Sequence, residues 1–271
     1  MWQRIRTAVV LIIIVDIALF ASSKPILFGP LLAIGAMVGA HEWTKLMPKW
    51  RQPAVFVLLV LVTTILSLWF QSIWVWVAWW TISVIIWFMA LYWVTHFPVY
   101  TKWYGKKLAL MGLIILTASI TAMFYLWQLS PWWILYVFLM VWCADSGAYF
   151  VGRKLGRHKM APNVSPNKSM EGLAGGLVTG LLVVIGISVF SLKLTGIALL
   201  AFVILSAMTI LASVLGDLFE SMLKRRADVK DSGTILPGHG GILDRIDSLL
   251  SATPIFALGF WGLQQLGLMV V

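Results

Sequence analysis

The chain has 271 residues, of which 61% are apolar and only 11% are charged, and its formal net charge is +10. Soluble globular proteins are about 45–50% apolar and about 25% charged, so this composition leaves too little polar surface for a water-soluble fold. It excludes a disordered chain and a soluble enzyme, and the single cysteine, Cys143, excludes an intramolecular disulfide. The sequence therefore predicts an integral membrane protein.

Nine apolar stretches follow one another along the chain, and each is long enough, or nearly so, to cross a bilayer as a helix. Their apolar runs are continuous rather than alternating, which favours helices over membrane strands. Pro25, Gly29 and Pro30 make the second stretch the weakest candidate, because they could turn it back within the membrane. We expect an all-α, polytopic transmembrane bundle forming one membrane domain (1–271), with about nine spans: 7–21, 25–41, 54–70, 73–94, 108–127, 131–151, 171–191, 194–216 and 248–271.

The basic residues are distributed unevenly about these spans. With nine spans, all but two of the 20 Lys and Arg residues fall on the side of the N-terminus, and the exceptions are Lys24 and Lys193. Cytoplasmic connections carry an excess of Lys and Arg, so the N-terminus is predicted on the cytoplasmic side of the cytoplasmic (inner) membrane. The positive charge also provides affinity for anionic lipid headgroups, which explains it better than nucleic-acid binding does.

Two features of the first stretch need separate interpretation. Residues 1–23 could be a cleaved signal peptide, but Asp16 interrupts their apolar run, so a first span is the preferred interpretation. We expect Asp16 to face the interior of the bundle and to form a hydrogen bond there, because a charge is costly within a membrane.

Acidic residues are concentrated in the second half of the chain, where eight of the ten lie between positions 145 and 247. We therefore expect residues 1–130 to be mainly membrane-anchoring spans. Residues 131–271 are expected to carry the active site on two long cytoplasmic connections, 152–170 and 217–247.

The first polar cluster begins where the sixth predicted span ends. Asp145 lies next to Ser146 at membrane depth, where a charge costs about 2.5–3.5 kcal/mol on insertion scales. A bound cation or an arginine partner would offset that cost. The basic residues that follow are those of a cytoplasmic loop, which explains them but not Asp145: Arg153, Lys154, Arg157, His158, Lys159 and Lys168.

The second polar cluster consists of two carboxylate pairs. Asp217 and Glu220 lie three residues apart at the end of one predicted helix, and Asp244 and Asp247 lie three apart at the start of the next. Residues at this spacing share a helix face, and the connection between them can double back to bring the pairs together. Oxygen ligands framed by basic side chains suit Mg²⁺ and a polyphosphate. As an alternative, Asp244 and Asp247 could simply interact with the helix dipole.

Basic residues and glycines stand between the two pairs. Lys224, Arg225 and Arg226 could bind phosphate or form a lipid-headgroup patch. The glycines of 237–241 can adopt positive φ and bring backbone N–H groups to an anion at a helix N-terminus. For His239 a hydrogen-bonding role is expected rather than metal ligation, because no second His or Cys stands at ligand spacing.

The residues from Ser221 to Asp247 resemble the signature of the phosphatidate cytidylyltransferases, or CDP-diacylglycerol synthases. The matching positions read Ser221-Met-Leu-Lys-Arg225, Lys230-Asp-Ser-Gly233 and Leu236-Pro-Gly-His-Gly-Gly-Ile-Leu-Asp-Arg-Ile-Asp247. Asn167 departs from the pattern, which has a basic or small residue there. The first cluster is also similar to the family at Asp145, Ser146, Gly147, Arg153, Ser165, Pro166, Lys168 and Glu171.

The resemblance implies transfer of the cytidylyl group of CTP to phosphatidate, giving CDP-diacylglycerol and pyrophosphate in phospholipid biosynthesis. It implies a homodimer, and Mg²⁺ bound by Asp217 and Asp244 beside a second cation such as K⁺. The catalytic residues that it implies are Lys224, Arg225, Lys230, Asp231, His239, Arg245 and Asp247. Those implied for substrate binding are Asp145, Ser146, Arg153, Ser165, Lys168, Glu171, Gly240 and Gly241.

The residue types support the same chemistry. A phosphate monoester has a second pKa of about 6, so phosphatidate is largely ionised at neutral pH and needs no general base. Metal ions and Lys or Arg side chains can offset its repulsion by the α-phosphate of CTP. We expect the lipid to enter laterally from the bilayer. Two alternatives are a CTP-dependent lipid kinase, with His239 or one of the aspartates as a base, and a cation-coupled transporter, with Asp16 and Asp145 as relay residues.

Overall fold

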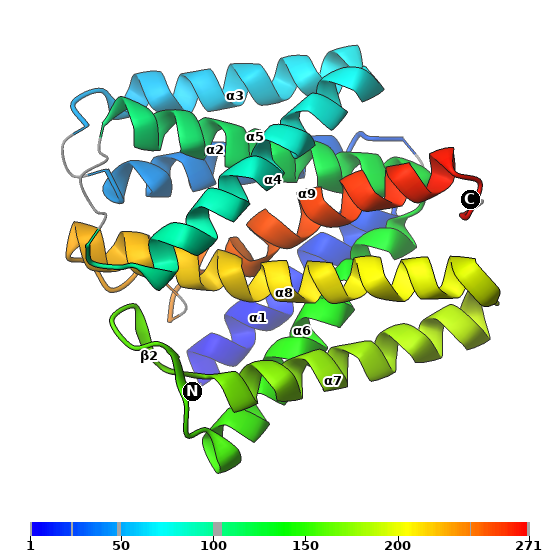
Figure 1. Ribbon diagram of the computed structural model, residues 1–271. Coiled ribbons are helices and arrows are strands. Elements are labelled where there is room, and N and C mark those ends of the chain that lie inside the picture. Colours follow the sequence, from blue (N-terminus) through cyan, green and yellow to red (C-terminus); the bar gives the residue numbers. More distant parts are fainter. Residues whose placement is uncertain (1, 23, 48–49, 100–104, 239, 270–271) are drawn as a thin grey trace.

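The structure is a computed structural model that describes residues 2–22, 24–47, 50–99, 105–238 and 240–269 (Figure 1). Within them nine α-helices account for nearly all the secondary structure, which confirms the predicted all-α class. The helices are α1 (Trp2–Phe20), α2 (Phe28–Lys45), α3 (Pro53–Phe70), α4 (Ile73–Thr95), α5 (Lys106–Leu129), α6 (Pro131–Leu155), α7 (Met170–Gly186), α8 (Gly196–Ala227) and α9 (Leu243–Gln265).

Seven of these helices, α3 to α9, are long and apolar enough to cross a membrane. A π-helical turn, Ile187–Ser191, continues α7. In α1 only the shorter segment Val9–Phe20 is apolar, and α2 is not among the seven. The chain is therefore an integral membrane protein, and the count of nine spans stays a prediction.

The connection predicted at 217–247 is shorter than expected, because both of its ends are helical. Helix α8 continues to Ala227, since Leu218, Phe219 and Leu223 extend its buried apolar face beyond residue 216. Asp228 then ends the helix in the left-handed conformation, with φ of 54°. Helix α9 begins at Leu243, one residue before Asp244, where the sequence predicted a helix to start. The acidic pairs therefore lie on helices, as their spacing requires.

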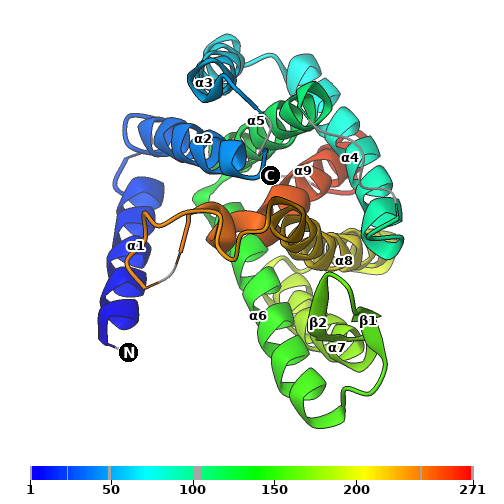
Figure 2. The ribbon, with the colours of Figure 1, turned by 90° about the vertical axis from the view of Figure 1, so that its left-hand side faces the viewer.

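The other predicted connection, 152–170, folds into a small hairpin. Strand β1 (Lys159–Ala161) pairs antiparallel with β2 (Ser165–Ser169), and the two side chains at its turn, Ala161 and Val164, are buried. Figure 2 shows this hairpin and the connection between α8 and α9 at the same end of the bundle.

Helix α5 forms the centre of the core. Every residue from Ile114 to Trp127 is buried, and among the candidate spans of the described chain α5 is the most buried. Trp43 of α2 packs on it and donates its indole N–H to the carbonyl of Leu108 at 3.1 Å. A Cβ on Gly112 would lie 2.3 Å from that indole nitrogen, so only glycine permits this contact. The first half of the chain thus builds the core as well as lipid-facing surface.

Helix α1 lies at the edge of the bundle (Figure 2). Its contacts with the rest include two hydrogen bonds: Trp127 donates its indole N–H to the carbonyl of Leu19 at 3.1 Å, and the Thr7 hydroxyl donates to the carbonyl of Pro237 at 3.1 Å. Asp16 is exposed on this helix, so the expectation that it faces the bundle interior is wrong. The reason is that α1 packs on the bundle with only one side.

Candidate active site

A polar pocket of about 760 Å³ opens between α6, the hairpin, α7 and α8. The close approach of the elements around it depends on small residues: a Cβ on Gly156 would lie 2.3 Å from the carbonyl oxygen of Gly152 and 2.7 Å from the Ser169 hydroxyl. Its charged lining residues are Asp145, Arg153, Lys159, Lys168 and Asp217, and Ser165 also lines it. All of these except Lys159 are residues that the sequence analysis selected.

Asp217 and Lys168 form an ion pair in this pocket. The Lys168 Nζ lies 2.5 Å from Asp217 Oδ2, and the side chains are 28% and 31% exposed, so the pair is open to a ligand. The other oxygen of Asp217, Oδ1, accepts the Ser221 hydroxyl at 3.3 Å. Asp145 interacts electrostatically with both members of the pair. The pocket can therefore bind an anion through Lys168 and a cation through its carboxylates.

A second cluster lies deeper, between α8 and α9, and is centred on Lys224. Its Nζ lies 2.9 Å from Glu220 Oε2 and 2.7 Å from Asp244 Oδ1, and these carboxylate side chains are only 3% and 5% exposed. Burying two carboxylates requires a cationic partner, which Lys224 provides. The sequence analysis placed Glu220 on the same face as Asp217 but did not select it for the site.

Asp247 connects the two clusters. It interacts electrostatically with Asp217 of the pocket and with Glu220 of the deeper cluster. The helices pack closely at this point, because a Cβ on Gly216 of α8 would lie 2.4 Å from the carbonyl oxygen of Asp247. The two carboxylate pairs thus come together, as the sequence analysis expected.

The connection between α8 and α9 folds over Asp244. Asp244 Oδ2 accepts the backbone N–H of Ser232 at 2.9 Å, the Ser232 hydroxyl at 3.0 Å and the backbone N–H of Gly241 at 2.8 Å. Gly238 and Gly240 have φ of 77° and 85°, which only glycine adopts readily, and Leu236 N–H donates to the carbonyl of Gly240 at 2.9 Å. The N–H of Gly241 is thus directed at an anion, here a carboxylate of the chain itself.

The donor set at the two predicted metal ligands fits Mg²⁺. Among the described residues, no three His, Cys, Asp or Glu side chains form a complete metal site. Mg²⁺ does not require one, because it is usually bound by one or two carboxylates together with water and substrate phosphates. Asp217 Oδ1 and Asp244 Oδ1 each accept one described hydrogen bond, whereas a carboxylate oxygen can accept about two. Each of these oxygens therefore has acceptor capacity left that a cation could use.

Several predicted residues lie away from the pocket. Glu171 accepts the backbone N–H groups of Arg157 and His158 at 3.0 and 3.2 Å and lies 2.6 Å from His158 Nδ1, so it holds the turn between α6 and the hairpin. Arg225 donates from Nε to the carbonyl of Val164 at 3.4 Å and joins α8 to the hairpin. Ser146, Lys230, Asp231 and Arg245 are exposed, and His239 lies outside the described residues.

One residue of this region lies in the first half of the chain and was missed by the sequence analysis. Glu42 of α2 is completely buried, and it accepts the backbone N–H of Leu243 at 2.8 Å, where α9 begins. The sequence held a signal for it, because an acidic residue within an apolar span points to a function. Its target, about 200 residues away in sequence, could not be inferred.

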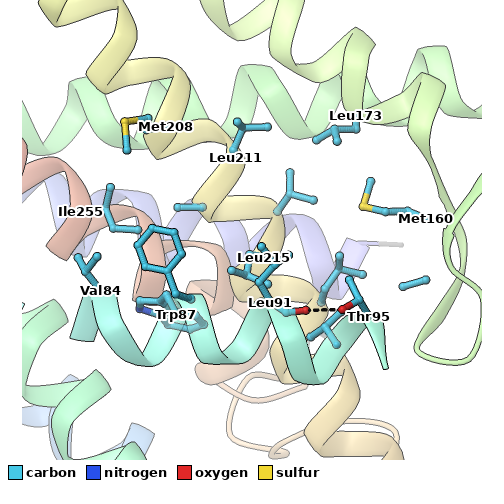
Figure 3. A pocket seen from close by; sticks show the side chains of 16 residues that line it. Val84, Trp87, Leu91, Thr95, Met160, Leu173, Met208, Leu211, Leu215 and Ile255 are labelled. Carbon is cyan, nitrogen blue, oxygen red and sulfur yellow. Dashed lines mark hydrogen bonds between the residues drawn. The ribbon is translucent and has the colours of Figure 1, made fainter. Parts of the chain in front are cut away.

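An apolar cavity of about 440 Å³ adjoins the polar pocket (Figure 3). It lies between α4, α7, α8, α9 and the hairpin, and Trp87, Leu91, Leu211 and Leu215 are among its lining residues. The Thr95 hydroxyl, which also lines it, donates to the carbonyl of Leu91 at 2.9 Å and so needs no further partner. The cavity and the polar pocket share three lining residues: Met160, Leu173 and Val214.

Comparison with known proteins agrees with this arrangement. The family model described as "Cytidylyltransferase family" matches residues 2–261. The phosphatidate cytidylyltransferase of Haemophilus influenzae is 39% identical over 291 residues, covering 94% of this chain and 96% of that protein. The enzyme of the same name from Pseudomonas aeruginosa is 38% identical over 275 residues, covering 96% of each chain. That of Bacillus subtilis is 50% identical over 125 residues, or 45% of each chain.

Proposed function

Because the chain belongs to the cytidylyltransferase family and transfers the cytidylyl group of CTP to phosphatidate, we propose that this transfer takes place in the polar pocket and the adjoining Lys224 cluster. The observation that carries the proposal is the junction of a charged pocket with an apolar cavity through Met160, Leu173 and Val214. An amphiphilic substrate needs both environments side by side. Family membership places the chain among nucleotidyltransferases rather than among lipid kinases or transporters.

The reaction joins two anions. A non-bridging oxygen of the phosphatidate phosphate attacks the α-phosphorus of CTP, the bond from that phosphorus to the β-phosphate oxygen breaks, and pyrophosphate leaves. The nucleophile is already largely ionised, because the second pKa of a phosphate monoester is about 6. The protein's part is therefore to position the two phosphates and to offset their repulsion. Arg153, Lys159 and Lys168 supply positive charge at the pocket wall.

Two residues would bind a divalent cation. Asp217 presents a partly exposed carboxylate to the pocket, and Asp244 lies beside Lys224 in the deeper cluster. When bound there, Mg²⁺ would supply positive charge to the phosphate oxygens of CTP. A second cation such as K⁺ and the roles of Asp247, Lys230, Asp231, His239 and Arg245 are part of the same proposal and rest on the family resemblance.

The apolar cavity would accept an acyl chain of phosphatidate. Its lining is apolar apart from the internally bonded Thr95 and the indole N–H of Trp87. Its volume of about 440 Å³ falls within the range of ligand pockets, which is about 300–1,000 Å³. With the acyl chain in this cavity, the phosphate of the lipid would lie beyond Met160 and Leu173, on the side of Lys168. Lateral entry from the bilayer fits this placement.

The topology and assembly complete the proposal. The hairpin and the connection between α8 and α9 lie at the same end of the bundle (Figure 2). These two segments and the helix ends next to them carry Arg153, Lys168, Lys224 and Lys230, and this positive charge supports a cytoplasmic orientation in the inner membrane. CTP would then reach the pocket from the cytoplasm. The family resemblance also supports a homodimer.

The test combines an assay with a cavity-filling variant. Purified protein in detergent should convert labelled CTP and phosphatidate into labelled lipid and an equal amount of pyrophosphate when Mg²⁺ is present. Leu211→Trp fills the cavity and should raise the KM for long-chain phosphatidate several-fold more than the KM for CTP. The matched control is Leu200→Trp, at an exposed position of the same helix that does not line the cavity. Equal effects of the two variants would contradict the acyl-chain site.

A further inference from the structure

Glu42 occupies an unusual place for a charged side chain. It lies in α2, is fully buried, and its Oε1 has no hydrogen-bond partner among the described residues. Its Oε2 accepts the backbone N–H of Leu243 at 2.8 Å and lies 3.4 Å from the Ser232 hydroxyl oxygen. A buried carboxylate is costly unless hydrogen bonds or charge compensate it. The N-terminus of α9 supplies both a donor and the positive end of a helix dipole.

The connection between α8 and α9 is shaped to accept this carboxylate. A Cβ on Gly233 would lie 2.0 Å from Glu42 Oε1, and a Cβ on Gly241 would lie 2.6 Å from both carboxylate oxygens. Both glycines are buried. Side chains at these positions would push the carboxylate away, so the glycines allow the backbone of the connection to lie directly against Glu42.

Ser232 links Glu42 to Asp244. Its hydroxyl lies 3.4 Å from Glu42 Oε2 and 3.0 Å from Asp244 Oδ2, and its backbone N–H donates to Asp244 at 2.9 Å. Gly241, which lies against Glu42, donates its N–H to the same Asp244 oxygen at 2.8 Å. The two segments that orient Asp244 are therefore the two that contact Glu42.

Helix α2 can act as a fixed support for this arrangement. Trp43, the residue after Glu42, is bonded to the carbonyl of Leu108 in α5 and packs against Gly112. On the other side, Leu243 lies against α2, since a Cβ on Gly39 would be 3.4 Å from Leu243 Cδ2. Glu42 is thus held between the central helix and the start of α9.

We propose that Glu42 is a positioning residue that fixes the 231–242 connection and thereby sets the orientation of Asp244 towards Lys224 and the bound phosphates. It is fully buried, does not line the polar pocket, and acts through Ser232, Gly241 and Leu243. The consequence for activity rests on the proposed function, whereas the ordering of the connection does not.

The experiment compares Glu42→Ala and Glu42→Gln with a control variant, Trp76→Phe, which lies outside the arrangement around Glu42. Loss of a residue that orients a ligand typically lowers metal affinity or activity about 10–100-fold, so Glu42→Ala should raise the Mg²⁺ concentration for half-maximal activity by about this factor and raise the KM for CTP. Glu42→Gln should recover part of the loss, because the amide oxygen can still accept from Leu243 N–H. Trp76→Phe removes a buried hydrogen bond of the same kind, from the indole N–H to the carbonyl of Ser67, and should lower thermal stability with unchanged Mg²⁺ dependence.

Hydrogen exchange provides a readout independent of activity. The amides of 231–242 should exchange faster in Glu42→Ala and Glu42→Gln than in wild type, whereas those of the 159–169 hairpin should not change. If Glu42→Ala does not fold, hydrogen exchange and the Mg²⁺ midpoint are measured on Glu42→Gln and Ser232→Ala instead. Unchanged exchange and an unchanged Mg²⁺ midpoint would overturn the proposal. Failure of the wild type to form CDP-diacylglycerol would overturn the proposed function, but the exchange result would still decide the role of Glu42.

Discussion

The two connections at the polar end of the molecule are each held by one glutamate that accepts backbone N–H groups, but the two glutamates differ in origin and surroundings. Glu171 holds the turn before the hairpin, whose donors lie 13 and 14 residues away, and its side chain is 25% exposed. Glu42 holds the connection before α9, where it accepts the backbone N–H of Leu243, 201 residues away, and it is fully buried.

This difference shows which parts of the site need the assembled helix bundle for their conformation. The turn held by Glu171 can form wherever α6 and α7 lie together, because all its partners are close in sequence. The connection held by Glu42 takes its shape only when α2, α5 and α9 have assembled. Asp244 is oriented by the connection that Glu42 holds, whereas Lys168 lies in the hairpin next to the turn that Glu171 holds. Substitutions around Asp244 and around Lys168 should therefore have different effects.

The largest expected effect is at the carboxylates themselves. Asp217→Asn and Asp244→Asn keep the side-chain shape but remove the anionic oxygen, and each should lower activity roughly 10²-fold or more, with the double variant hardly worse, because residues that act as a unit are non-additive. The measurement is activity per folded molecule, titrated with Mg²⁺. Asp228→Asn, exposed at the end of α8, is the control and should be mild. Near-wild-type turnover in either single variant would end the shared-metal proposal.

The next effect separates the two lysines. Lys224→Met leaves Glu220 and Asp244 buried without their cation, and breaking a buried ion pair costs about 3–5 kcal/mol of stability. Lys168→Met breaks a pair that is about 30% exposed, and such pairs contribute about 0–1 kcal/mol. Thermal unfolding and activity should therefore both fall in Lys224→Met, whereas Lys168→Met should lose activity at nearly unchanged stability. Equal destabilisation by the two lysine variants would contradict the distinction between the buried Lys224 cluster and the partly exposed pair of Lys168 and Asp217.

The smallest expected effect is at Glu171. Glu171→Gln weakens the local, partly exposed hydrogen bonds from the N–H groups of Arg157 and His158. It should therefore leave the Mg²⁺ dependence unchanged and accelerate hydrogen exchange only around 156–169. Its counterpart, Glu42→Gln, should accelerate exchange at 231–242 and shift the Mg²⁺ midpoint. A shift of the Mg²⁺ midpoint by Glu171→Gln would contradict the distinction between the roles of Glu171 and Glu42.

Much of this protein could be predicted from the sequence, because the relevant signals are local. Continuous apolar runs determine transmembrane helices, since lipid requires every backbone group to be bonded within its own segment. The i,i+3 spacing of Asp217 with Glu220 and of Asp244 with Asp247 places each pair on one helix face. The signature from Ser221 to Asp247 identifies the family without any knowledge of the fold.

Tertiary structure decided what depends on contacts between distant segments. The exposure of Asp16 could not be derived from its apolar surroundings, because burial depends on how α1 packs against other helices. The interaction of Glu42 with Ser232 and Leu243 joins residues about 200 positions apart, and no spacing rule reaches that far. Residue types and local spacing determine which helices form and which side chains can do chemistry. Only the packing of α2 against α5 and α9 determines that a buried glutamate from the first half orients a carboxylate in the second.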